Sequence, residues 1–199
     1  KPDFESPECL DMELLGRHFE IISEGGEIDI PKFDFRRQKR SPQIYERLRL
    51  TGREVMIVEG IHAHNPQIIG HQPKAVRIFV STSPNARLVR RMIRDNNFRG
   101  ASASYTYSLW ANVRKNEEEN ILPLRPNADI DIDTTLLYEP GVLKPFVEDL
   151  FSRPETDGNF RKAREDILAE FSKYEAIPEK YLPPTSLLRE FIGGSSYKY

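Results

Sequence analysis

Four arginines stand on one side of a helix that the sequence predicts for residues 84–97. At about 100° per residue they fall within an arc of about 100°; they are Arg87, Arg90, Arg91 and Arg94. The apolar residues of the same stretch fall on the opposite side. Guanidinium groups suit phosphate oxygens because their planar fork binds bidentately and stays charged. We therefore expect either a cationic stripe for a polyphosphate, continued by Arg99, or a solvated face with salt bridges to Asp95 and nearby acids.

A carboxylate follows the short apolar run 55–58, which is typical of a buried parallel strand. Ligands gather at the carboxyl ends of strands in open α/β sheets, and Glu59 occupies that place. A carboxylate there can hold Mg²⁺ directly or through water. The alternative is an ordinary acid that caps the next turn.

Two further segments have side chains suited to a small ligand. Phe33 and Phe35 share one face of a predicted strand, where they either stack on a flat base or, more commonly, pack in a core. Glu5, just before a predicted helix, can accept hydrogen bonds from ribose hydroxyls. More commonly, such an acid favours the helix dipole.

Three histidines lie within ten residues of one another, at His62, His64 and His71. A zinc site is one interpretation of that spacing. No cysteine joins them, and the nearest carboxylate is Glu59. We therefore favour loop histidines beside an active cleft over a structural zinc.

The phosphate-binding loop of nucleotide kinases is missing from these residues. Neither Gly-x-x-x-x-Gly-Lys-Ser/Thr nor Gly-x-Gly-x-x-Gly occurs. Phosphoryl transfer depends mostly on such a loop, its lysine and Mg²⁺ for positioning and charge neutralisation. We expect the 199 residues by themselves to lack kinase activity.

The elements that must position these side chains alternate between strands and helices. Residues 27–35 and 43–50 predict a hairpin, with Pro31 indicating an edge or a bulge. Two buried strands, several helices and a late strand follow. This order predicts an α/β fold with a mainly parallel sheet. The other predicted strands are 55–58, 76–80 and 129–133, and the predicted helices are 7–24, 84–97, 104–120, 140–152 and 159–173.

Composition narrows the class of protein. Apolar residues make up 38% and charged residues 30%, with a net charge of −2, which argues against a general binder of nucleic acid. The single cysteine, Cys9, excludes an intrachain disulfide and fits a reducing compartment. No apolar run approaches the length of a membrane span, and no signal peptide is visible. We expect a cytoplasmic location and leave a homo-oligomer open. The first residue is not methionine, which suggests part of a longer chain.

Residues 3–133 contain five segments that, in their order along the chain, resemble the uridine kinase/phosphoribulokinase family of P-loop kinases. Residues 3–11, Asp-Phe-Glu-Ser-Pro-Glu-Cys-Leu-Asp, resemble the family segment Phe-Asp-x-Pro-x-Ala-x-Asp, and Ile-Pro-Lys-Phe-Asp-Phe at 30–35, with Arg40, resembles Pro-x-Tyr-Asp-Phe…Arg. The other resembling segments are Glu-Gly-Ile at 59–61, Arg-Arg-Met-Ile-Arg-Asp at 90–95 with Arg-Gly at 99–100, and Ala-Asp-Ile at 128–130.

The resemblance implies a role for each matching position. Phe4 and Glu5 would flank a nucleoside, with Glu5 on the ribose hydroxyls, and Phe33 would stack near the base. Glu59 would sit by Mg²⁺. Lid arginines on the phosphates of ATP would be Arg91, Arg94 and Arg99.

Several positions depart from the family pattern. Glu5 stands where aspartate is usual, Phe33 replaces a tyrosine, and Gln38 occupies the place of a base-reading histidine. Ala101 stands where a further lid arginine is common. The change at Gln38 leaves specificity for uridine and cytidine open, so the resemblance implies a nucleoside-like acceptor.

The tail resembles a bacterial subgroup in which such a domain follows a region related to the N-terminal part of threonyl-tRNA synthetase. The matching residues are Trp110, Val113, 117–123, 138–139 and 189–194. We expect a kinase-like domain at 1–151, without its phosphate-binding loop, and a helical, proline-containing extension at 152–199.

The function that the sequence predicts is ATP- and Mg²⁺-dependent phosphorylation of a nucleoside or similar small hydroxyl compound by a longer polypeptide. One alternative is a non-catalytic module that binds nucleotides or RNA and regulates. Another is a P-loop kinase with a different acceptor, such as a sugar phosphate or a pantothenate-like compound.

Overall fold

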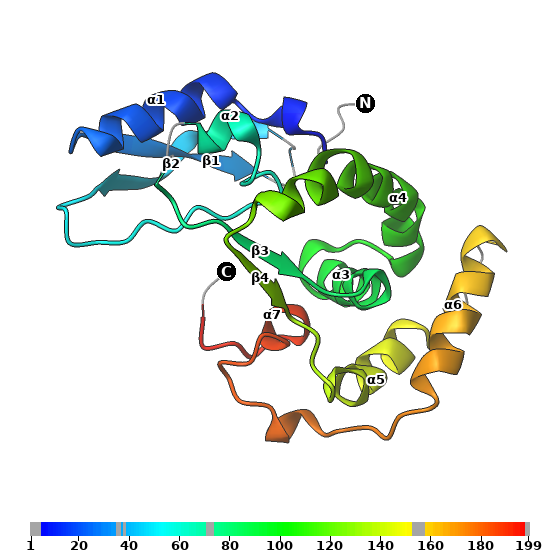
Figure 1. Cartoon of the computed structure of the whole chain (residues 1–199). Helices are drawn as coiled ribbons and strands as arrows, with labels where there is room; N and C mark the ends of the chain where they lie inside the picture. Colours follow the sequence, from blue (N-terminus) through cyan, green and yellow to red (C-terminus); the bar gives the residue numbers. More distant parts are fainter. Residues whose placement is uncertain (1–4, 35–36, 38, 71–73, 153–157, 198–199) are drawn as a thin grey trace. The chain divides into compact units, whose positions relative to one another are not determined.

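The computed structural model describes residues 5–34, 37, 39–70, 74–152 and 158–197. The chain divides into two compact units, whose elements are labelled in Figure 1. The first unit comprises Lys1–Ile78 and Asn116–Ile130, and the second comprises Phe79–Lys115 and Asp131–Tyr199. Neither unit is continuous in sequence, because a segment of each lies between the segments of the other.

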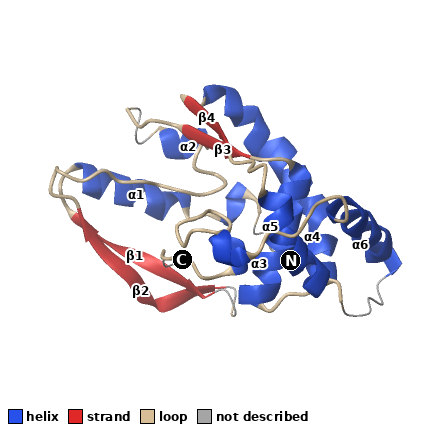
Figure 2. Ribbon diagram, turned by 90° about the horizontal axis from the view of Figure 1, so that it is seen from below, coloured by secondary structure: helices blue, strands red, loops and turns tan. Residues whose placement is uncertain are grey.

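The first unit begins with a 3₁₀ turn, η1 (Pro7–Cys9), and the amphipathic helix α1 (Met12–Ser23). Helix α1 turns Phe19 and Ile22 inward. A two-stranded antiparallel hairpin follows, drawn as the long pair of arrows in Figure 2, with β1 at Glu27–Asp34 and β2 at Lys39–Arg49. The register shifts on both sides of Pro31, which confirms the predicted bulge.

The remaining elements of the first unit are short. Helix α2 spans Pro66–Ile69 and is capped by Asn65, whose side chain accepts a hydrogen bond from the Gln67 backbone N–H. A π-helical turn, η2 (Glu117–Ile121), leads into a 3₁₀ segment, η3 (Leu122–Asn127). The helix predicted for 104–120 therefore ends early, and its last residues adopt the wider turn.

A small parallel sheet joins β3 (Ile78–Ser81) and β4 (Ile130–Asp133). Hydrogen bonds at its two ends advance in the same direction along both strands: the Arg77 carbonyl accepts from the Asp129 N–H, and the Ser81 carbonyl from the Thr134 N–H. Together with the surrounding helices, this sheet confirms the predicted α/β class.

The strand predicted at 55–58 is wrong. The described backbone forms no strand there, and Val55 and Ile57 are 88% and 85% exposed. An apolar run forms a buried strand only where neighbouring strands complete its hydrogen bonds. Among the described residues none pairs with this run.

The second unit is built on helix α3 (Pro84–Arg99). Ser83 caps it by accepting a hydrogen bond from the Ala86 N–H, Pro84 occupies the first turn, and Gly100 ends it in the left-handed conformation. These signals confirm the helix predicted at 84–97, with two more residues at its end. Helices α4 (Ala103–Asn116), α5 (Glu139–Leu150), α6 (Gly158–Phe171) and α7 (Arg189–Ile192), with the 3₁₀ turn η4 (Glu179–Tyr181), complete the set.

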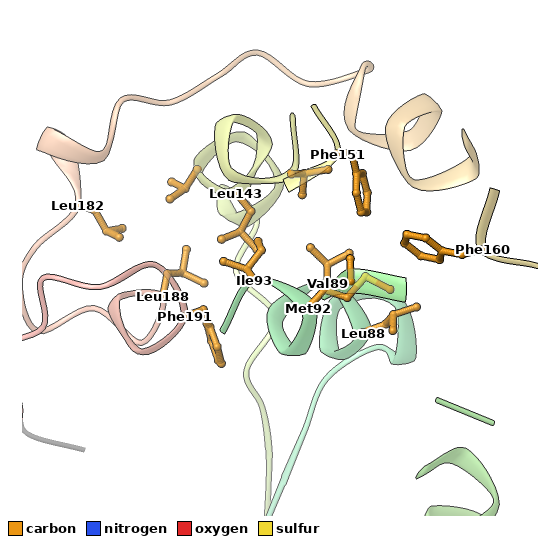
Figure 3. Packing of buried hydrophobic residues seen from close by; sticks show 13 residues of the cluster. Leu88, Val89, Met92, Ile93, Leu143, Phe151, Phe160, Leu182, Leu188 and Phe191 are labelled. Carbon is orange, nitrogen blue, oxygen red and sulfur yellow. The ribbon is translucent and has the colours of Figure 1, made fainter. Parts of the chain in front are cut away.

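The core of the second unit forms where the apolar face of α3 meets the C-terminal half of the chain (Figure 3). Met92 and Ile93 of α3 are almost fully buried, as is Leu143 of α5. The tail adds Phe160, Leu182, Leu188 and Phe191. The tail therefore packs into the same core as α3, while the predicted sequence boundary at 151/152 stays a prediction.

Candidate functional site

Asp11 and Arg40 connect α1 to the hairpin in the first unit. One carboxylate oxygen of Asp11 caps α1 by accepting the Leu14 N–H at 3.0 Å, and the other accepts Nη2 of Arg40 at 2.9 Å. The Leu14 hydrogen bond, and after it the Arg40 hydrogen bond, lowers the pKa of Asp11. Arg40, predicted as a substrate-binding residue, is thus held in place by an ionised carboxylate.

Phe33 stands opposite Arg40 across the hairpin. The residue is 42% exposed. Arg40 also lines an apolar hollow of about 370 Å³ between α1, the hairpin and residues 56–58, and the other ionisable lining residues are Asp11 and His18. An exposed aromatic ring, a fixed guanidinium and an apolar hollow form a surface that suits a flat, partly apolar ligand.

Glu5 is tied to the loop that follows 55–58. The ring Nε2 of His62 donates a 2.7 Å hydrogen bond to the Glu5 carbonyl oxygen, and His62 is buried. This contact between the His62 side chain and the Glu5 backbone, 57 positions apart, fixes where the Glu5 side chain begins. His62 is therefore a buried anchor for this segment.

Glu59 lies immediately before the His62 turn and is exposed. One accessible carboxylate suits Mg²⁺, which keeps several waters and takes one or two carboxylates beside substrate phosphates. Among the described residues no group of three histidine, cysteine or acidic side chains could hold a metal ion. Of the predicted site and zinc residues, Phe4, Gln38 and His71 lie outside the described residues.

In the second unit, three predicted lid arginines converge on one carboxylate, that of Asp95. Nε and Nη2 of Arg94 donate to Oδ1 at 3.0 and 2.9 Å. Nε of Arg91 lies 3.5 Å from Oδ2, and Nη1 of Arg99 lies 3.4 Å from Oδ1. The Asp95 side chain is 9% exposed. The salt bridges to Asp95 that the sequence predicted as an alternative are formed, and they bring the three arginines together at one carboxylate.

Arg90 corrects the predicted stripe. We expected it to share an outward face with Arg91 and Arg94, but it is 6% exposed and ion-paired with Glu139. Its guanidinium also lies 5.4 Å from the centre of the Phe191 ring. The physical reason is that α5 and α7 cover this edge of α3. Arg87 likewise packs beside Trp110, 6.0 Å from the ring centre.

The two sets of predicted site residues belong to different units. Glu5, Phe33, Arg40 and Glu59 are in the first, and the three arginines are in the second. A single cleft that contains both sets therefore stays a prediction.

Sequence reasoning missed two residues that organise these sets. Asp95 appeared only as a surface partner, although its spacing of four residues from both Arg91 and Arg99 is the signal that could have identified it. His62 appeared only as a loop histidine. No local pattern indicates a contact with a carbonyl so far away in the sequence.

The phosphoribulokinase/uridine kinase family model matches residues 1–136, more than half of the chain. The chain belongs to this family. The matched residues include both sets of site residues.

Curated relatives of the family agree with this assignment. The chain is 30% identical over 131 residues to a uridine kinase of Chloroflexus aurantiacus, covering 65% of this chain and 61% of the relative. It is 31% identical over 134 residues to a uridine kinase of Clostridium perfringens, covering 66% and 62%. It is 29% identical over 131 residues to a uridine kinase of Staphylococcus epidermidis, covering 65% and 61%. These matches span about three fifths of each relative's length.

Within the part of the chain that the structure describes, no helix has both the length and the apolar character needed to cross a membrane.

Proposed function

We propose that this chain forms the acceptor-binding and arginine-bearing part of an ATP- and Mg²⁺-dependent kinase. The transferred group is the γ-phosphate of ATP, and the acceptor is a hydroxyl of a nucleoside or nucleoside-like small molecule. The observation that carries the proposal is the convergence of Arg91, Arg94 and Arg99 on Asp95, within residues that match a kinase family.

The three arginines supply charge stabilisation in this proposal. Negative charge spreads over the oxygens of the transferring phosphoryl group, and fixed guanidinium donors stabilise it without reorganisation. Asp95 brings the three guanidinium groups together, and guanidinium groups bind phosphate oxygens well. Arg91, Arg94 and Arg99 are the catalytic residues that we assign.

The first unit binds the acceptor in this proposal. Glu5 accepts hydrogen bonds from the ribose hydroxyls, Phe33 stacks near the base and Arg40 orients the ligand. Phe4 and Gln38 join them on the family resemblance alone. Glu59 would hold Mg²⁺, which neutralises charge on the phosphates of ATP.

The proposal concerns a cytoplasmic polypeptide that also carries the phosphate-binding loop. Residues 1–199 contain no such motif. The same proposal includes a region related to threonyl-tRNA synthetase before the kinase domain. The 199-residue chain alone then has no turnover, because it lacks the loop that positions ATP.

A phosphate-transfer screen tests the proposal. The longest natural polypeptide that contains this chain is incubated with γ-³²P-labelled ATP, Mg²⁺ and single acceptors: uridine, cytidine, other nucleosides, sugar phosphates and pantothenate. We expect labelled product with a nucleoside and none with the double variant Arg91→Ala/Arg94→Ala. Transfer only to a non-nucleoside would correct the acceptor class. No transfer to any acceptor, with ATP still bound, would replace the kinase with a non-catalytic nucleotide-binding module.

A further inference from the structure

Asp95 is the shared partner of three arginines that come from two turns of α3 and its end. Arg91 precedes it by four residues and Arg99 follows it by four, so all three residues lie along one side of the helix. Arg94 is adjacent in sequence and places two guanidinium nitrogens on the same oxygen.

The same residue also ends the helix. The Asp95 carbonyl oxygen accepts hydrogen bonds from the backbone N–H groups of Gly100 and Ala101. Gly100 has a φ of 66°, the left-handed conformation that terminates a helix. Asp95 therefore holds Arg99 twice, through its side chain and through the backbone turn that follows Arg99.

Like charges crowd together around this carboxylate. The pKa of Arg99 is lowered by burial and, next in size, by the charge of Arg94. Arginine side chains have many rotamers, and the free energy of ordering them must be recovered when a ligand binds. A carboxylate shared by three guanidiniums lowers that cost in advance.

We propose that Asp95 is a positioning residue that keeps Arg91, Arg94 and Arg99 together, so that one di- or triphosphate group contacts all three. The inference rests on the proposed function for the identity of the ligand. It adds a residue that need not touch the phosphate and acts through the arginines.

The direction in which Asp95→Asn changes the affinity for an anion distinguishes a positioning role of Asp95 from a purely electrostatic one. Replacing Asp95 by Asn removes a negative charge, which by itself would strengthen anion binding. Loss of positioning has the opposite effect, because the three arginines then lose the partner that they share and the ligand must order them. Binding that weakens while the net charge becomes more positive is the result that only positioning explains.

The test measures inorganic tripolyphosphate binding to the chain by titration calorimetry, with sulfate as the control anion. For Asp95→Asn we expect the dissociation constant for tripolyphosphate to be at least tenfold higher than in the wild type. The matched control is Asp166→Asn on α6, which removes an equal charge at an exposed ion pair with Lys162. We expect it to bind as the wild type does. Equal or tighter binding by folded Asp95→Asn would overturn the inference.

A second readout reports the arginines directly. In wild-type protein we expect protected side-chain Nε–H signals from Arg91 and Arg94, whose Nε atoms face Asp95, by ¹⁵N NMR, assigned with Arg→Lys variants at 91 and 94. Asp95→Asn should lose that protection. If Asp95→Asn fails to fold, Asp95→Glu keeps the charge but displaces the carboxylate. It should bind tripolyphosphate more weakly than wild type, and wild-type affinity with shifted Nε–H signals would contradict positioning.

The two proposals fail separately. Asp95-dependent binding of tripolyphosphate without phosphate transfer to any acceptor would remove the kinase function and keep this inference. Phosphate transfer at the wild-type rate by Asp95→Asn would keep the kinase function and remove this inference.

Discussion

Arg90 and Glu139 form a buried ion pair that connects α3 to α5, 49 residues apart in sequence. Nε and Nη2 of Arg90 each lie 2.6 Å from a different carboxylate oxygen. The two side chains are 7% and 5% exposed. Nη2 also donates to the Thr134 carbonyl at 2.9 Å. An arginine from the predicted phosphate-binding stripe is thus part of the interior.

Glu139→Leu should lower the free energy of unfolding by about 3–5 kcal/mol, because it leaves a buried guanidinium without its carboxylate. The double variant Arg90→Met/Glu139→Leu should recover most of that loss, since no charge then remains buried. Urea unfolding followed by circular dichroism measures both. If Glu139→Leu were as stable as the double variant, the guanidinium of Arg90 would not be desolvated, contrary to what its burial indicates.

Asp129 should titrate well below an ordinary aspartate. Hydrogen bonds from the Arg77 side chain and then from the Arg77 backbone N–H lower its pKa from 3.8 to about 2. Because the folded-state pKa is depressed, the pair stabilises the fold above about pH 4, and that contribution is lost as the pH falls toward about 2.

Carboxyl ¹³C NMR measures the titration of Asp129 directly. Arg77→Met should move its midpoint upward toward 3.8, the ordinary value for the group. Added salt should do the same in part, since the pair is solvent-exposed. A midpoint near 3.8 in the wild type would rule out the ion pair in solution.

Gly100→Ala should cost about 1–2 kcal/mol in stability, because the left-handed φ of 66° brings a Cβ too close to the following carbonyl. No neighbouring heavy atom lies within 4 Å of the added Cβ, so packing does not contribute. Gly158→Ala is the matched control: it also meets nothing within 4 Å, and its φ is outside the left-handed region. We expect that control to be neutral or slightly stabilising in thermal unfolding.

Phe160→Ala should destabilise the protein by about 3–5 kcal/mol, as expected for removal of a buried aromatic ring. Phe160 is 1% exposed and lies against Tyr107 and Phe151, with ring centres 5.3 and 5.7 Å away. Leu137→Ala, at a side chain that is 97% exposed, should change stability by less than about 0.5 kcal/mol. Equal effects of the two variants in urea unfolding would mean that the tail does not share the core of α3.

Arg91→Ala should weaken transition-state binding by about 2–4 kcal/mol in the phosphate-transfer assay, by analogy with other groups that stabilise developing charge. Arg161→Ala removes an equal charge from the exposed face of α6 and should leave kcat/KM unchanged. An unaltered rate for Arg91→Ala would return the arginines to a purely structural role.

The local sequence pattern was enough to predict several secondary-structure elements. Ser83, Pro84 and Gly100 carry the start and end of α3 in their own conformational preferences, and Pro31 indicates the bulge because it cannot donate to a ladder. The motifs in 3–133 led to the family that the comparison then matched over 1–136. The helix ends and the bulge depend on residues a few positions apart, where chain geometry is nearly fixed.

Contacts between distant segments were decided by the tertiary structure. The sequence showed Arg90, Arg91 and Arg94 as one stripe, but Glu139 and Phe191 bury the first, and Asp95 collects the other two with Arg99. It also showed 55–58 as an apolar run without showing whether a neighbour completes its hydrogen bonds. Helix periodicity assigns a side chain to a face, and only the segments packed against that face determine whether it meets solvent, a carboxylate or the core.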